Sequence, residues 1–191
     1  MEVTGIILLV VLVVVVIYFV MIYNQLVQIK HNVSKAWANI DVLLKQRHDE
    51  LPKLVEACKQ YMKFEQDTLM RVMEARSHVS TAREQQNIGA LGQAEGELRA
   101  ALGKLFALAE AYPELKTDQT FLHLQARISS LANAIADRRE FYNESVNINN
   151  VRIEQFPNSI VAALFSFRDM ALLKFSTQET ADVDVKQLFQ A

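Results

Sequence analysis

Residues 6–22 read IILLVVLVVVVIYFVMI, an unbroken apolar run of 17 residues. No charged side chain occurs anywhere in residues 3–29. At about 1.5 Å of rise per residue, a helix of this run is roughly 26 Å long, close to the thickness of a bilayer's hydrocarbon core. A single strand would leave its backbone groups unpaired in lipid, so only a helix suits the run. It therefore predicts a transmembrane helix over residues 5–23. Its lipid-facing anchor residues are represented by Ile6, Leu9, Val13, Ile17 and Val20.

A cleaved signal peptide is the competing interpretation of this run. Signal peptides have a basic first region, a shorter apolar stretch and a cleavage site with paired small residues. Here Glu2 is the only charge before the run, and residues 21–24 include no such pair. We expect an uncleaved, single-span anchor after a short tail at residues 1–4. Because Lys30 and Lys35 follow the span and nothing basic precedes it, the positive-inside rule places the rest of the chain in the cytoplasm.

The composition of the remaining chain favours helix and excludes several kinds of site. The whole sequence has five glycines and three prolines, which leaves little material for hairpins. A net charge of -2 provides no basic face for nucleic acid, so no nucleic-acid partner is expected. The single cysteine, Cys58, excludes an internal disulfide and cysteine-based zinc sites, and its neighbours predict a small core residue.

Apolar residues recur at three- and four-residue steps in four segments up to about residue 153. This periodicity predicts an all-α fold. The transmembrane helix continues without a break into an antiparallel, four-helix-type bundle over residues 24–175, with long helices packed as in coiled coils. Pro52 is expected to end or bend the first helix, with Asp49 capping the next. Residues 87–96 hold three of the five glycines and are expected to form a flexible loop containing Gly92 and Gly96.

The C-terminal part of the chain differs from the bundle segments. Residues 156–159 read FPNS, which is a turn signal. The apolar stretch at residues 160–165 is too short to span a membrane, so it either packs back on the bundle or lies at the membrane surface. Residues 176–191 are polar, and we expect a poorly ordered tail.

No catalytic motif stands out in the sequence. There is no His-Glu-x-x-His, no glutamate followed three residues later by histidine, no phosphate loop and no nucleophile elbow. No catalytic residue, metal site or cofactor is therefore predicted, and the protein is expected not to be an enzyme. The group Arg47-His48-Asp49-Glu50 is interpreted as a solvated helix end.

Polar residues on the apolar stripes predict a structural network. Arg138 is in phase with the stripe of the fourth segment, while Glu65 and Arg76 lie near that of the second. Because buried charges persist only when paired, Arg138 is predicted to pair with Glu65 or with Glu110 and to fix helix register. The alternative is a ligand-binding or enzymatic module with a pocket lined by Glu65, Arg76 and Arg138.

Seven motifs occur in a fixed order along the chain. They read YNQLV at 23–27, AWANIDV at 36–42, RHDELPKLV at 47–55, LFALAEAYPELK at 105–116, FLHLQ at 121–125, RREFYN at 138–143 and FP at 156–157. In this order they resemble the LemA family of bacterial membrane proteins over roughly residues 23–168. The sequence departs from the family's usual wording at Lys53, Gln46, Gly96 and Ala132. Gly96 and Ala132 lack the polar side chains usual there, which puts any polar site completed by those groups in doubt.

The resemblance implies an N-terminal anchor and a helical bundle, and no reaction, because the family has no established activity. Relatives include a magnetosome-membrane protein, and family members often occur near membrane metalloproteases of the HtpX type. We therefore expect a scaffold in the bacterial inner membrane that contacts lipid and either self-associates as a homo-oligomer or assists another membrane protein. Some relatives carry a lipoprotein signal and face the periplasm, so a periplasmic location stays open.

Overall fold

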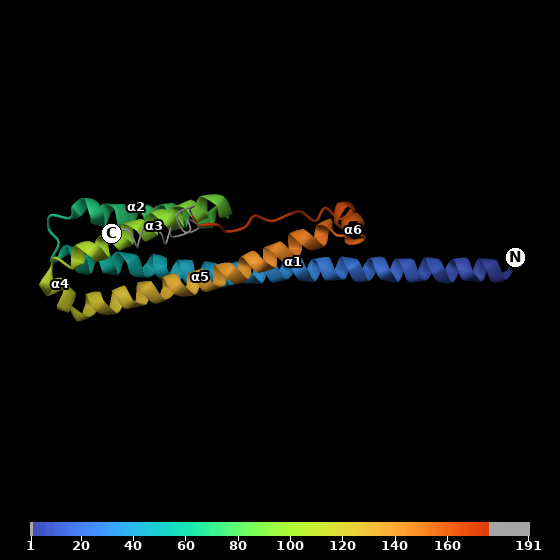
Figure 1. The fold of residues 1–191 in the computed structure, drawn as a ribbon, viewed down its shortest axis with the longest axis horizontal. Helices are drawn as coiled ribbons and strands as arrows, with labels where there is room; N and C mark the ends of the chain where they lie inside the picture. The colour runs from blue at the N-terminus through green and yellow to red at the C-terminus, as the bar shows by residue number, and fades with distance from the viewer. Residues whose placement is uncertain (1, 176–191) are drawn as a thin grey trace, which may run out of the picture. The chain divides into compact units, whose positions relative to one another are not determined.

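The computed structural model describes residues 2–175, and the polar tail predicted at residues 176–191 lies outside this range (Figure 1). Residues 2–175 form six helices and no strand, which confirms the all-α class. The helices are α1 (Glu2–Lys59), α2 (Gln66–Glu84), α3 (Ile88–Ala109), α4 (Pro113–Thr117), α5 (Gln119–Glu154) and α6 (Asn158–Leu164).

The chain divides into two compact units, each built from two stretches of sequence. Among the described residues, the first comprises residues 2–43 and Ala134–Leu172, and the second comprises Leu44–Asn133 and residues 173–175. Both α1 and α5 contribute residues to each unit. Because α1 is one helix from Glu2 to Lys59, the predicted continuation of the apolar run without a break is confirmed.

In the first unit, α1 and α5 lie side by side (Figure 1). The ring of Trp37 meets that of Tyr142 edge-on, with centroids 5.9 Å apart. At the end of the apolar run, Ile22 and the following Leu26 form a small buried cluster with Val161 and Ala162 of α6. Within the stretch at residues 160–165, Val161 and Ala162 thus pack on α1, whereas Ile160 and Leu164 are exposed. Whether the stretch packs back on the bundle or lies at the membrane surface stays a prediction.

In the second unit, the last turns of α1, the helices α2 and α3, and the first turns of α5 each bury one apolar stripe, and α2 packs against α3. At the start of α3, the Asn87 side chain accepts a hydrogen bond from the Ala90 N–H at 3.0 Å. At the start of α5, the Asp118 side chain accepts one from the Phe121 N–H at 2.8 Å. These side-chain oxygens bond N–H groups that have no partner inside the helix. The buried stripe residues include Leu51, Leu54, Cys58, Leu69, Val72, Leu91, Leu98, Leu105, Phe121 and Ile128.

Two predictions about helix ends need correction. Pro52 does not end α1, and no new helix capped by Asp49 starts there, because α1 continues to Lys59. The other predicted effect of Pro52, a bend, stays a prediction. Residues 87–96 are not a loop, because α3 begins at Ile88. Gly92 is a buried helical position where an added Cβ would clash with the Lys174 carbonyl oxygen. Close approach of the chain, and not flexibility, explains this glycine.

An extended segment follows α6, here named the C-terminal strap (residues 166–175). Its first residues belong to the first unit, where α5 side chains hold their backbone. Leu173 and Lys174 belong to the second unit, where Leu173 is buried and the Lys174 backbone lies against Gly92.

Candidate functional site

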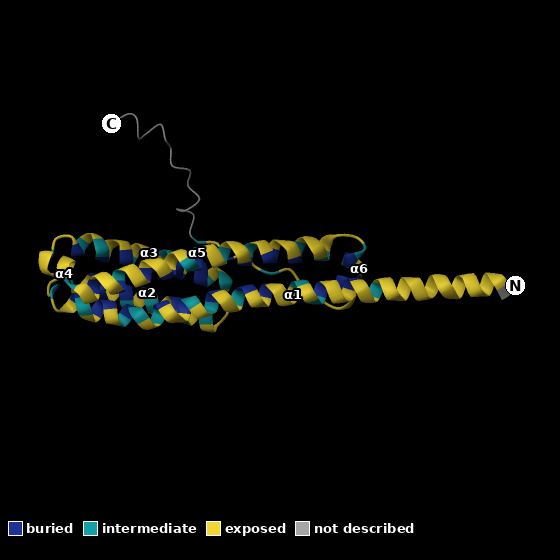
Figure 2. Cartoon of the chain, turned by 90° about the horizontal axis from the view of Figure 1, so that it is seen from below, coloured by how far each residue is buried: buried dark blue, intermediate teal, exposed yellow. Residues whose placement is uncertain are grey.

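The predicted anchor is a continuous exposed apolar surface. Residues 3–18 of α1 are all exposed, and Figure 2 shows this end of α1 uncovered. The five anchor residues Ile6, Leu9, Val13, Ile17 and Val20 are each about half exposed or more, since their exposed fractions run from 48% to 63%. No other helix within residues 2–175 is long and apolar enough to cross a membrane. A large exposed apolar surface requires a covering phase or partner.

A buried ion pair lies in the second unit, between α1 and α3. Nη2 of Arg47 donates to Oε1 of Glu95, and the two residues are only 5% and 6% exposed. The interpretation of Arg47 as part of a solvated helix end is therefore wrong. Both residues occupy stripe positions, Arg47 between Leu44 and Leu51, and Glu95 between Leu91 and Leu98. Their position in phase with these buried leucines is the sequence signal that could have identified both as buried residues.

A second polar contact joins α2 to α1 at Pro52. Proline has no N–H, so the carbonyl oxygen of His48, four residues earlier, lacks its helical donor. Arg76 supplies one, because its Nε donates to that oxygen at 2.9 Å. Its Nη2 also lies 2.5 Å from Nε2 of His48. Because arginine only donates, Nε2 accepts and the ring proton sits on Nδ1, which is buried and has no hydrogen-bond partner among residues 2–175.

These surroundings lower the pKa of His48. Burial, which penalises the charged imidazolium, is the first cause, and the positive charge of Arg76 is the second. The neutral ring is therefore the form that fits this site.

The predicted network of Glu65, Arg76, Glu110 and Arg138 does not form as a buried set. Arg138 is exposed, because the α5 stripe passes from Ile135 through the half-buried Arg139 to Tyr142. Glu110 is exposed and accepts from Lys116 at 3.0 Å. Glu65 is half-buried and precedes α2, where its carbonyl accepts from the Thr68 N–H at 3.1 Å. Only Arg76 takes a structural role, with His48 as its partner.

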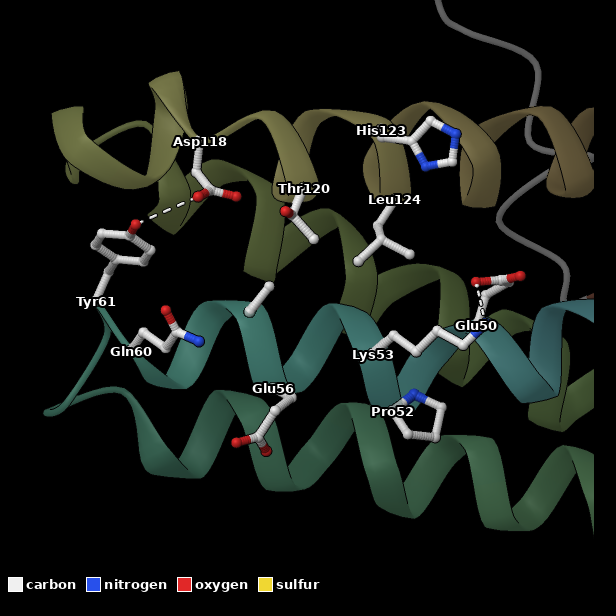
Figure 3. Close-up of a pocket in the computed structure, with 11 residues that line it drawn as sticks. Glu50, Pro52, Lys53, Glu56, Gln60, Tyr61, Asp118, Thr120, His123 and Leu124 are labelled. Carbon is white, nitrogen blue, oxygen red and sulfur yellow. Dashed lines mark hydrogen bonds and ion pairs between the residues drawn. The ribbon is translucent and has the colours of Figure 1, made fainter.

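An open groove of about 830 Å³ runs between the end of α1 and the start of α5 in the second unit (Figure 3). Tyr61 donates to Asp118 across it at 3.3 Å, and Lys53 bonds Glu50 at 3.1 Å within α1. His123 lies on the opposite wall from Lys53. The enzymatic alternative predicted a pocket lined by Glu65, Arg76 and Arg138. None of these three residues lines this groove.

The remaining candidate groups offer little chemistry. Residues 2–175 contain no cluster of three histidine, cysteine or acidic side chains that could hold a metal ion. Burial raises the pKa of the Cys58 thiol to about 12, so its reactive thiolate is suppressed at neutral pH.

Side chains of α5 hold the C-terminal strap through its backbone. Asn150 bonds Met170 twice, accepting from its N–H at 2.9 Å and donating to its carbonyl at 3.0 Å. Asn149 donates to the Arg168 carbonyl at 3.2 Å, and the Tyr142 hydroxyl donates to the Ala171 carbonyl at 3.1 Å. These asparagines are thus a polar contact face of a continuous helix.

Comparison with known proteins agrees with this architecture. The model of the LemA family matches residues 36–187. The chain belongs to the LemA family. Among its LemA-family relatives, Protein LemA of Metamycoplasma hominis is 27% identical over 177 residues, covering 90% of this chain and 78% of that protein. Magnetosome protein MamQ 2 of Paramagnetospirillum magneticum is 23% identical over 193 residues, covering 89% of this chain and 71% of that protein. The LemA-family chain carries a candidate membrane anchor in the N-terminal part of α1.

Proposed function

We propose that this protein is a single-pass, membrane-anchored scaffold without enzymatic activity. The observation that carries the proposal is the exposed, charge-free run of α1, which continues as one helix into the helical units. In the proposal, lipid covers this run and α1 holds the units beside the membrane. The relatives named as magnetosome proteins support a role at a membrane.

The anchor lies in the inner membrane of a bacterium, with the units in the cytoplasm. Lys30 and Lys35 support this orientation, because both follow the run and both are exposed. A cysteine at the exposed Gln85 tests it with a membrane-impermeant maleimide on spheroplasts. Labelling only after lysis is expected, whereas labelling of intact spheroplasts would place the units in the periplasm.

The absence of enzymatic activity is proposed from how the interior charges are used. Arg47 is bonded to Glu95 and Arg76 to His48, so each of these groups stabilises a contact between helices. Neither pair lines the groove beside Tyr61 and Asp118.

A membrane protein, such as a protease of the HtpX type, or a second copy of the chain is the proposed partner. The loop between α1 and α2 offers a contact point, because Phe64 there is 93% exposed. Beside it in the sequence, Met62, Met70 and Met73 line a groove of about 740 Å³. Flexible, polarizable methionine side chains adapt well to apolar partners.

Photo-crosslinking in native membranes tests the scaffold proposal. A photoreactive residue replaces Phe64, and a matched variant carries it at the polar, exposed Gln85. One dominant adduct from position 64, absent from position 85, is expected and distinguishes a second copy from another membrane protein by mass. Diffuse adducts at both positions, together with a turnover activity that Arg76 variants abolish without unfolding, would contradict the scaffold.

A further inference from the structure

The region around α6 has both buried and exposed apolar side chains. Val161 and Ala162 are buried in a cluster with α1, while Ile160 and Leu164 are 48% and 69% exposed. Phe156, before α6, is 81% exposed, and Phe165, just after it, is 53% exposed. No charged residue occurs from Gln155 to Phe167. The exposed set of Phe156, Ile160, Leu164 and Phe165 is named the α6 apolar face.

The position of α6 along α1 is set by direct contacts within the first unit. Its cluster includes Ile22 and Leu26, with Phe19 packed against it. The ring of Tyr23 lies 4.7 Å from that of Phe165 and 6.0 Å from that of Phe167, measured between centroids. These α1 residues straddle the end of the apolar run at Ile22, and the first charge beyond it is Lys30.

This level corresponds to the boundary between hydrocarbon and headgroups if the run spans a bilayer. From Phe19 to Leu26, α1 rises about 10 Å, which is comparable to the depth over which interfacial helices sit in a membrane surface. Tyrosine is typical of this boundary, where its ring and hydroxyl meet apolar and wet surroundings. At this level, lipid and not water would therefore surround the exposed α6 side chains.

We infer that the α6 apolar face is a second membrane contact, which inserts into the boundary region of the same leaflet that the end of the α1 anchor crosses. This inference rests on the proposed anchor. Lipid is chosen as the occupant because the face continues the exposed apolar surface of α1 through direct packing, so one apolar phase covers both. Two contacts at one leaflet would hold α1 at a fixed depth, which a single span does not.

Site-directed spin labelling of the full chain tests this inference. Cys58 is the single native cysteine and is buried, so one added cysteine is labelled selectively. Leu164→Cys reports on the face. Val13→Cys reports on the anchor, and Val42→Cys is a matched apolar position that is 55% exposed in the same unit. The protein is reconstituted in vesicles of phosphatidylcholine and phosphatidylglycerol, and collision with oxygen is compared with collision with a water-soluble nickel chelate.

We expect the oxygen-to-nickel ratio at Leu164 to be several-fold higher than at Val42 and below that at Val13. An aqueous ratio at Leu164 with a lipid ratio at Val13 overturns the inference and leaves the anchor intact. Low access to both reagents at Leu164, with spin–spin broadening between copies, also overturns it, because a second chain then covers the face. Aqueous ratios at both positions overturn the anchor and the inference together. Ile160→Cys repeats the measurement if Leu164→Cys does not fold.

Discussion

Arg76 donates to the main-chain oxygen of His48, the one carbonyl of α1 that Pro52 deprives of its helical donor. The contact explains why a proline stands inside a continuous helix. A side chain from α2 replaces the missing N–H and, in doing so, joins two helices of the second unit. Pro52 is thus a point of contact between helices, where the sequence pattern predicted that the helix ends or bends.

Arg76→Leu should destabilise the second unit by about 1–3 kcal/mol, because the partly buried His48 carbonyl and the His48 ring both lose their donor. The loss should shrink in a Pro52→Ala background, since the substituted alanine supplies the helical N–H to the same oxygen. Denaturant unfolding of detergent-solubilised protein, followed by circular dichroism, measures both backgrounds. Arg71→Leu, at an exposed position of α2, is the control with little expected change. Equal losses in the two backgrounds would refute the coupling.

The Arg47–Glu95 pair should behave as a buried ion pair. Either Arg47→Met or Glu95→Leu alone should cost about 3–5 kcal/mol, because each leaves an uncompensated charge inside the unit. The double variant should cost clearly less than the sum, since it leaves neither charge. The same unfolding assay measures the cycle, with Lys104→Leu at an exposed position of α3 as the control. Strictly additive losses would show that the two side chains do not interact.

His48 should make the protein less stable in acid. Its folded pKa lies below the ordinary value of 6.5, so at pH values just below 6.5 the unfolded chain binds more protons at this residue. Stability from His48 is therefore fully present above pH 6.5 and is lost as the pH falls toward the folded pKa. Unfolding curves across this window should show a loss that the His48→Gln variant lacks.

His78 acts in the opposite direction and serves as the control for His48. Its hydrogen bond to Glu97, at 2.9 Å, raises its pKa above 6.5. Its contribution is present below pH 6.5 and is lost as the pH rises through the folded pKa. The His78→Gln variant should therefore lose more stability in acid than the parent. A smaller acid loss in that variant would contradict the assignment of opposite signs.

The sequence predicted the helices well where the apolar period is strong. The charge-free run, the stripe of α5 from Phe121 to Val146, and the turn at Pro157 all lie where the pattern placed them. Pro52 was misread because its effect depends on whether another helix can supply the missing donor. Arg76, which supplies it, lies 28 residues from His48 in the sequence.

The buried charges also depend on tertiary contacts that the sequence pattern does not show. Arg138 follows Ile135 by one three-residue step, but the stripe takes a four-residue step there, which leaves Arg138 exposed and Arg139 half-buried. Arg47 and Glu95 were in phase with their stripes and are buried, yet nothing local relates residues 48 positions apart. Periodicity places a residue on a face, whereas pairing depends on tertiary contacts.

Asn150 should hold the C-terminal strap through Met170. Asn150→Leu removes both hydrogen bonds, and Asn150→Asp keeps only the acceptor for the Met170 N–H. Hydrogen exchange of the Met170 amide should therefore accelerate most in Asn150→Leu and less in Asn150→Asp, with a loss of about 0.5–1.5 kcal/mol per bond. Asn147→Leu, at an exposed position of the same helix, should leave the exchange unchanged. Unchanged protection in Asn150→Leu would show that other contacts hold the strap.

Gly92 and Gly103 offer a matched pair of glycines within α3. An added Cβ at Gly92 would clash with the Lys174 carbonyl oxygen, while one at Gly103 meets nothing within 4 Å. Gly103→Ala should stabilise the protein by roughly 0.5–1 kcal/mol through helix propensity alone. Gly92→Ala gains the same propensity but must displace backbone at Lys174, so it should be destabilising overall. It should also speed proteolysis near Leu173, a residue that is buried in the parent.

The sign difference between the two glycine variants is the decisive observation. Helix propensity is common to both positions, so it cannot give a gain at Gly103 and a loss at Gly92. If Gly92→Ala stabilises the protein as much as Gly103→Ala does, the Lys174 backbone does not lie against α3. If Gly92→Ala destabilises it without exposing Leu173 to protease, the strap stays in place and the strain falls on α3 instead.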